Sequence, residues 1–147
     1  PLTVRFIEYM PSGNGEEWKE SEILTTSQIK SRLDNVGKLI SIPSDRWDGP
    51  AKRFRFEGAR GEIGLIGAVS SHFCGDCNRL RLTPDGKIRT CLFSDEEIDV
   101  RELLRRGGSD QDLKQRLLVA LGTKPERHHI NTYLFKKCQR NMSAIGG

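Results

Sequence analysis

The sequence lacks any apolar run long enough to cross a membrane. Hydrophobic residues make up 35% of its 147 residues and charged residues 30%, and no stretch approaches the roughly 18–20 apolar residues that a bilayer span needs. The chain also opens without the pattern of an export signal. We therefore expect a cytoplasmic protein with no membrane partner, in which clustered thiols indicate metal or redox chemistry rather than structural disulfides.

The sequence is also poor in the features of a nucleic-acid-binding surface. The formal net charge of +4 and the pI near 9.0 suit an anionic ligand. The basic residues, however, are spread among acidic ones, as in residues 95–112, and aromatic residues amount to only 7%. Binding to single strands needs cationic residues gathered beside aromatics on which bases stack, so no nucleic-acid partner is expected.

The first 49 residues have the pattern of a single strand–helix unit. Residues 2–10 predict a buried strand, residues 11–18 a loop, and residues 25–37 a helix. The strand begins almost at Pro1 and its sheet partners are barely present, which indicates a piece of a longer protein. An apolar strand with a free edge predicts self-association, most simply as a homodimer.

Beyond a loop at residues 42–51 the pattern changes to hairpins, and we predict a domain boundary between residues 49 and 50. Residues 52–70 alternate phenylalanine with arginine and return after a turn, which is typical of a β-hairpin. Residues 78–93 predict a second hairpin that turns at the sequence "PDGK".

Two helices are predicted after the second hairpin, over residues 99–107 and 109–122. Asp99 is placed to cap the first helix, and Ser109 with Asp112 has the spacing of a capping box at the start of the second. The second helix carries an apolar stripe that we expect to face the core, formed by Leu113, Leu117 and Leu121.

Three of the four cysteines lie in the stretch His72–Phe93. Cys74 and Cys77 have the Cys-x2-Cys spacing that lets two thiolates hold one metal centre from a tight turn, which Gly75 permits. Cys91 lies across the hairpin and can swing back as a third ligand. Structural zinc sites usually have four ligands, commonly two such cysteine pairs, and here the second pair is missing.

On the residues alone, three interpretations of these thiols stay open. His72 as a fourth ligand would complete a Cys3His zinc site. The three cysteines could instead pack without meeting at a metal. The third interpretation is an iron–sulfur cluster held by three thiolates, with one iron left open.

Two arginines beside the cysteines favour the cluster. Residues two apart on a strand point the same way, so Cys77, Arg79 and Arg81 share a face, while Leu80 and Leu82 are expected to face the core. Guanidinium groups bind anions through paired hydrogen bonds, and an anionic ligand at an open iron would need them. Without the cysteines, the two arginines would indicate only a solvated strand face.

At four places the sequence resembles the C-terminal part of the GTP 3′,8-cyclase family, the radical S-adenosylmethionine lyases of molybdenum cofactor biosynthesis. The matching segments are "RFIEYMPSGN", "FCGDCNRLRLTPDGKIRTCLF", "KPERHHIN" and the terminal "GG". The resemblance implies an α+β fold in two parts. Residues 1–49 would be the last β–α unit of an incomplete (β/α) barrel, and residues 50–147 a small domain of antiparallel hairpins and helices that carries the cluster.

The resemblance also implies a role for each matched residue in the second part. A [4Fe-4S] cluster, whose open iron binds the guanine ring of GTP, would have as its ligands Cys74, Cys77 and Cys91. The residues in contact with GTP would be Arg79, Leu80 and Arg81.

Two further matches concern the cofactor and the end of the chain. Met10 would contact S-adenosylmethionine, and Arg5 on the same strand is a weaker candidate for an anion contact in the active site. Gly146 and Gly147 would form a tail that reaches the active site and is needed for activity. Two glycines can thread a narrow channel that any side chain would block; a disordered end is the alternative.

One feature of the family is absent from the sequence. The 147 residues contain no Cys-x3-Cys-x2-Cys motif, which in the family holds a second cluster that cleaves S-adenosylmethionine to a radical. The remaining thiol, Cys138, is isolated and is expected to be a bystander. We therefore expect this chain to bind substrate but not to catalyse the reaction alone.

Two functions of other classes are alternatives. A zinc-ribbon module that binds nucleic acid is the main alternative, and the dispersed basic residues count against it. The closing Gly-Gly could instead be a ubiquitin-like tail, in which the cysteines would have no place. His128 and His129 are expected in an exposed polar loop rather than at a metal.

Overall fold

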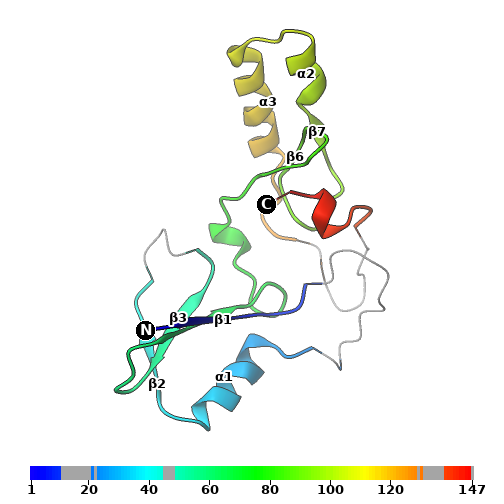
Figure 1. Cartoon of the computed structure of the whole chain (residues 1–147). Coiled ribbons are helices and arrows are strands. Elements are labelled where there is room, and N and C mark those ends of the chain that lie inside the picture. The colour runs from blue at the N-terminus through cyan, green and yellow to red at the C-terminus, as the bar shows by residue number, and fades with distance from the viewer. Residues whose placement is uncertain (11–20, 22, 45–48, 129, 131–137, 147) are drawn as a thin grey trace. The chain divides into compact units, whose positions relative to one another are not determined.

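The computed structural model describes residues 1–10, 21, 23–44, 49–128, 130 and 138–146 (Figure 1). The chain divides into two compact units, Pro1–Met10 with Trp18–Phe73, and Pro11–Glu17 with Cys74–Gly147. Strands and helices do not alternate regularly, so the fold is α+β, as the sequence predicts. None of the described helices has the length and apolar character of a membrane span.

The first unit is built on a mixed sheet with the strand order β1-β4-β3-β2. β1 (Thr3–Ile7) pairs in parallel with β4 (Glu62–Ile66). β3 (Lys52–Phe56) lies antiparallel to β4 on one side and to β2 (Leu39–Ile42) on the other. The predicted β3–β4 hairpin is confirmed.

Alternation along β3 separates its charged from its aromatic side chains. Arg53 and Arg55 both bind the carboxylate of Glu62, at 2.7 Å and 3.0 Å. Phe54 lies beneath the ammonium of Lys30, which is 5.7 Å from the ring centroid. The hydrogen bond from Arg53, with that from Arg55, holds the pKa of Glu62 below its ordinary value against the opposing effect of burial.

Glu8 joins the end of β1 to the start of α1 (Thr26–Asp34). Its side chain is 1% exposed. The carboxylate accepts hydrogen bonds from the backbone N–H groups of Val69 and Ser70, both at 2.7 Å, and of Thr26 at 3.3 Å; the Ser70 hydroxyl donates a fourth. A buried charge is stable only when such partners replace its water, so Glu8 fixes α1 and the loop after β4 to one point.

β1 confirms the predicted first strand but not its burial. It lies at the edge of the sheet and pairs only with β4 among the described strands. Four apolar side chains on or beside it are between 47% and 80% exposed, namely Leu2, Val4, Ile7 and Tyr9. The predicted free apolar edge is therefore present, and self-association through it stays a prediction.

The second unit contains a three-stranded antiparallel sheet with the order β5-β6-β7. β5 (Arg81–Leu82) and β6 (Lys87–Arg89) form the predicted second hairpin. Gly86 gives its turn a φ of +79°, which residues with a Cβ rarely adopt. β7 (Ile98–Asp99) completes the sheet on the other side of β6.

The two predicted helices follow β7 and pack against each other (Figure 1). α2 (Arg101–Arg105) is short, and its N-cap is Val100 rather than the predicted Asp99. The carboxylate of Asp99 nevertheless accepts from the backbone N–H of Glu102 at 2.9 Å, so it satisfies a donor of the first turn. α3 (Asp110–Gly122) begins at the predicted capping box of Ser109 and Asp112.

The core of the second unit lies between its sheet and α3. Its buried members are Ile88, Val100 and Ala120, and Ile98 and Leu113 pack against them. The predicted apolar stripe on α3 is right only for Leu113. Leu117 and Leu121 are 36% and 51% exposed, because the helix turns Ala120 rather than these leucines toward the core.

The division into units differs from the boundary expected near residue 50. Strands on both sides of that loop belong to one sheet, and the second unit begins at Cys74. Compact units need not coincide with inherited domains, so the division into residues 1–49 and 50–147 stays a prediction, as does the barrel origin of β1 and α1. The sequence-based prediction also missed β2 and β7, which are four and two residues long.

Replacing Glu8 by glutamine should destabilise the first unit by about 2–3 kcal/mol, because hydrogen bonds to a charged acceptor are lost and an amide N–H then faces backbone donors. Urea unfolding followed by circular dichroism measures the change. Glu57→Gln is the matched control, since its ion pair with Lys38 is solvent-exposed and should contribute about 0–1 kcal/mol. Equal effects of the two variants would contradict the anchoring role of Glu8.

Candidate metal and substrate site

The three predicted ligand cysteines all lie in the second unit, on what we call the cysteine hairpin (residues 74–91). Cys74 begins a short 3-10 helix, Cys74–Asp76, and its carbonyl accepts from the backbone N–H of Cys77 at 3.1 Å. Cys91 follows β6 by two residues. The three thiols are free and partly exposed, so they are available as ligands.

Arg81 lies beside two of these cysteines. Burial lowers the pKa of its guanidinium, and the charge of Arg79 lowers it further, whereas Cys77 and Cys91 raise it. Both thiols are therefore close enough to act on one guanidinium. The Nε of Arg81 is buried without a hydrogen-bond partner among the described residues, so the side chain that these thiols affect has an unsatisfied donor.

Lys124, which sequence reasoning missed, contacts both arms of the cysteine hairpin. Its ammonium lies 3.7 Å from the Sγ of Cys77, and it donates to the carbonyl oxygens of Arg79 at 3.0 Å and Thr90 at 2.6 Å. The signal for it in the sequence is its place at the start of the segment "KPERHHIN".

Leucines of the first arm do not face the core, contrary to expectation. Leu80 is 36% exposed and Leu82 is 61% exposed. β5 is only two residues long, so the arm from Cys77 to Leu80 is not held to strict alternation by pairing with a neighbour. Leu80 is thus an accessible side chain between the two arginines.

The residues fit an anionic iron–sulfur cluster better than a single ion. Within the described ranges no three histidine, cysteine, aspartate or glutamate side chains come together to hold one metal ion. A cubane cluster makes a different demand, because its thiolates bind separate irons. The unpartnered donors, Arg81 Nε and the buried hydroxyl of Thr90 beside Cys91, together with the nearby Lys124, suit a negatively charged group.

A buried ion-pair network supports the second arm. Arg89, opposite Arg81 in the β5–β6 register, is 1% exposed. It binds Glu97 at 3.0 Å, Asp95 at 3.6 Å and the carbonyl of Ser94. Removing one partner from such a buried pair leaves an uncompensated charge, so this network fixes the chain around the cysteines.

Glu97 extends the network to the C-terminal tail. It also binds Lys87 at 3.2 Å and Arg140 at 2.9 Å, and Arg140 holds both carboxylate oxygens of Asp85 at 3.0 Å and 2.7 Å. Burial alone would raise the pKa of Glu97, but Arg140, Lys87 and Arg89 outweigh it and the net pKa lies below its ordinary value. The hydrogen bond from Arg140 likewise lowers the pKa of Asp85.

The described part of the tail, residues 138–146, is packed rather than loose. Ile145 is fully buried, and Cys138 is 4% exposed with its thiol directed at the Leu92 carbonyl. Gly146 has a φ of +77°, and a Cβ on it would lie 2.0 Å from the carbonyl oxygen of Leu82. Only glycine fits there, next to Arg81; Gly147 lies outside the described residues.

Cys138 is the one buried thiol among the four cysteines. Burial raises the pKa of its thiol, and Asp95 raises it further. Its expected role as a bystander stays a prediction. Cys138 belongs to the packing of the tail.

The remaining predicted site residues are distributed over both units. Arg5 and Met10 belong to the first unit, where the Arg5 side chain lies along Gly64 on β4. His72 also belongs to the first unit, so the Cys3His alternative stays a prediction. His128 packs edge-on against Phe93, with ring centroids 5.2 Å apart, and His129 lies outside the described residues.

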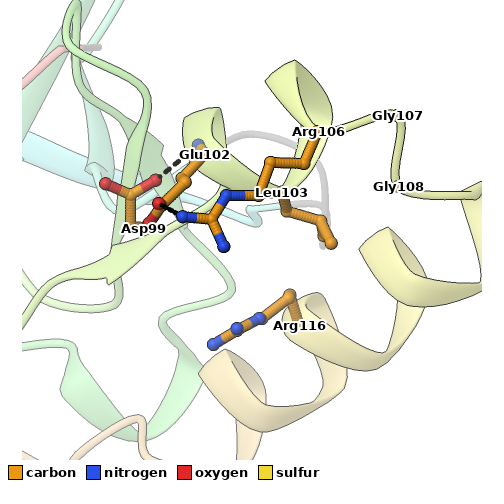
Figure 2. Close-up of a pocket in the computed structure, with 7 residues that line it drawn as sticks. All are labelled: Asp99, Glu102, Leu103, Arg106, Gly107, Gly108 and Arg116. Carbon is orange, nitrogen blue, oxygen red and sulfur yellow. Dashed lines mark hydrogen bonds and ion pairs between the residues drawn. The ribbon is translucent and has the colours of Figure 1, made fainter.

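A pocket of about 280 Å³ lies between α2 and α3, and none of the predicted site residues is part of its lining (Figure 2). Arg106 and Arg116 project toward it, and Arg106 is bound to Glu102. The positive charge of the pocket is therefore partly neutralised by Glu102, which is also part of its lining. Its lining contains no cysteine and none of the predicted site residues, so it is not the candidate site.

Comparison with known proteins places the cysteine hairpin in a family. The family model described as Molybdenum Cofactor Synthesis C matches residues 2–130. The chain belongs to the Molybdenum Cofactor Synthesis C family. The matched residues include the three cysteines of the cysteine hairpin, Arg79, Arg81 and Lys124.

Curated relatives of this family member are named GTP 3′,8-cyclase. The chain is 38% identical over its whole length to the protein of Syntrophomonas wolfei and 45% identical to that of Heliobacterium modesticaldum, and it covers 45% of each. Over 98% of its length it is 41% identical to the protein of Thermodesulfovibrio yellowstonii. The chain thus spans less than half the length of these relatives and corresponds to their C-terminal part.

Gly146→Ala should detach the end of the tail, because the new methyl group would clash with the Leu82 carbonyl and the backbone would enter a conformation that costs about 1–2 kcal/mol. Hydrogen exchange over residues 138–146 should accelerate. Gly122→Ala is the control: nothing lies within 4 Å of its Cβ position, and alanine favours the helix. Unchanged exchange in Gly146→Ala would show that the tail does not depend on this contact.

Arg140→Met should remove stability that depends on pH. The folded-state pKa values of Glu97 and Asp85 lie below their ordinary values of 4.5 and 3.8, so their stabilisation is complete above those values and is lost as the pH falls through the lowered pKa values. The difference in Tm between wild type and variant should therefore be large at pH 6 and shrink toward pH 3.

The exposed Arg105→Met is the control for the lost charge, and its Tm difference should stay small at every pH. A Tm difference for Arg140→Met that does not change with pH would mean that Arg140 acts through packing and not through these carboxylates.

Proposed function

We propose that this chain is the substrate-binding part of a GTP 3′,8-cyclase. Cys74, Cys77 and Cys91 would hold a [4Fe-4S] cluster with one open iron. When bound, the cluster supplies a Lewis-acidic iron at which the guanine of GTP is held. The observation that carries the proposal is Arg81, whose buried, unpartnered Nε lies among groups that include two of the three thiols.

The residues of this chain would bind and orient the substrate rather than transfer protons. Arg79 and Arg81 present two guanidiniums that match the acceptors of an anionic nucleotide, and the exposed Leu80 offers an apolar contact between them. Holding a reactant in one orientation accounts for a large part of the acceleration in many enzymes. Two preorganised cations beside a metal centre serve this purpose.

The tail adjoins the cysteine hairpin beside Arg81. Gly146 touches the backbone directly after Arg81, so the glycine pair would shape the substrate site while adding no side chain to it. Gly147 would extend this path. Both are proposed as site residues that act through the backbone.

The rest of the reaction would depend on the part of the protein that the relatives contain beyond this chain. S-adenosylmethionine would be bound there, with Met10 and Arg5 contributing contacts. The 147 residues contain no Cys-x3-Cys-x2-Cys motif, so the chain alone is proposed to bind GTP without converting it. A cytoplasmic location and a homodimer joined along the β1 edge are part of the same proposal.

Arg81→Met tests the proposed substrate contact. In the chain reconstituted without oxygen, the variant should retain its iron and sulfide but bind GTP roughly tenfold or more weakly, because a charge-assisted hydrogen bond is lost. Equilibrium dialysis with labelled GTP measures the affinity. Arg105→Met, which removes an exposed arginine on α2, should bind GTP like wild type.

Two results would count against the proposal. Wild type that takes up one zinc and no sulfide would favour the zinc-ribbon alternative. Equal GTP affinity of Arg81→Met and wild type would remove Arg81 from the substrate site.

A further inference from the structure

We propose that Lys124 is a positioning residue that clamps the two arms of the cysteine hairpin and sets a cation beside one cluster ligand. The part of the inference that concerns the cluster rests on the proposed function, whereas the clamp does not depend on it. Lys124 has three N–H donors, and the described residues offer three acceptors: the thiol of Cys77 and the carbonyls of Arg79 and Thr90. All three lie on the cysteine hairpin.

These acceptors lie on opposite arms. Arg79 is on the arm that leads from Cys77 to Arg81, and Thr90 directly precedes Cys91 on the other. β5–β6 pairing reaches only as far as Arg81 and Arg89, so beyond that point no sheet hydrogen bonds join the arms. Lys124 bridges them where the ladder has ended, and it thereby sets the distance between Cys77 and Cys91.

α3 carries Lys124 to this position. Ala120, near the end of the helix, is fully buried against Ile88 and Val100. The backbone N–H of Lys124 then donates to the Leu121 carbonyl at 3.2 Å, which continues the helical turn past Gly122. The ammonium is thus fixed through α3 to the same core that holds β6.

An ordinary surface lysine has a different set of contacts. Exposed lysines of this chain, such as Lys30 and Lys38, pair with carboxylates, whereas within the described ranges Lys124 is bound to two carbonyls and a thiol. Among the described residues this cation therefore meets no carboxylate that would offset its charge. A positive charge held at this place favours an anionic group bound by the cysteine hairpin.

Lys124→Met tests both parts of the inference, with Lys114→Met on the exposed face of α3 as the control for one lost positive charge. In the chain reconstituted without oxygen, iron loss to an excess of chelator should be roughly tenfold faster in Lys124→Met, as is typical when a group supporting a metal ligand is removed. Lys114→Met should lose iron at the wild-type rate. Lys124→Arg, which retains the cation, should fall between them.

The second readout does not need the cluster. In the metal-free chain, amide hydrogen exchange over residues 77–91 should accelerate roughly tenfold in Lys124→Met while α1 and β1 keep the wild-type rates. If wild type itself takes up no iron and sulfide, the proposed function fails and this exchange result alone decides the clamp. If Lys124→Met equals Lys114→Met in exchange, or in iron loss from a loaded chain, the inference is overturned.

Discussion

The carboxylate of Glu97 is the contact on which the arrangement of the second unit depends. It receives Arg89 from β6, Lys87 from the same strand and Arg140 from the tail. Arg89 is almost fully buried, and a buried guanidinium without its carboxylate would be strongly unfavourable. The chain must therefore bring β6 and the tail to the segment around Glu97 before it can bury this part of the hairpin.

This constraint shapes the candidate site from both ends. On one side it fixes β6, and with it Thr90 and Cys91. On the other it anchors the tail, so that Ile145 is buried and Gly146 meets the Leu82 carbonyl. Lys124 then joins the arms beyond the last strand pairing. Cys74 and Cys91 form no disulfide among the described residues and are partly exposed, so their thiols are accessible to a ligand.

The sequence predicted features that depend on local rules. The capping box at Ser109, the turn at Gly86 and the alternation of Arg53 with Phe54 follow from spacing and φ preference, and all are confirmed. Asp99 accepts from a backbone N–H of the first turn of α2, although Val100 is the N-cap. The sequence did not predict features that tertiary packing determines. Lys124 and Arg140 carry no local signal of their partners, which lie more than 30 residues away, and the exposure of Leu117 depends on the rotation of α3 against the sheet.

The most direct test of the account is Mössbauer spectroscopy of the wild-type chain, reconstituted with iron-57 and sulfide in the absence of oxygen, with and without GTP. The account predicts about four irons per chain, one of which changes its signal when GTP is added while the other three do not. A chain that binds no sulfide, or a cluster whose four irons are all indifferent to GTP, would contradict it.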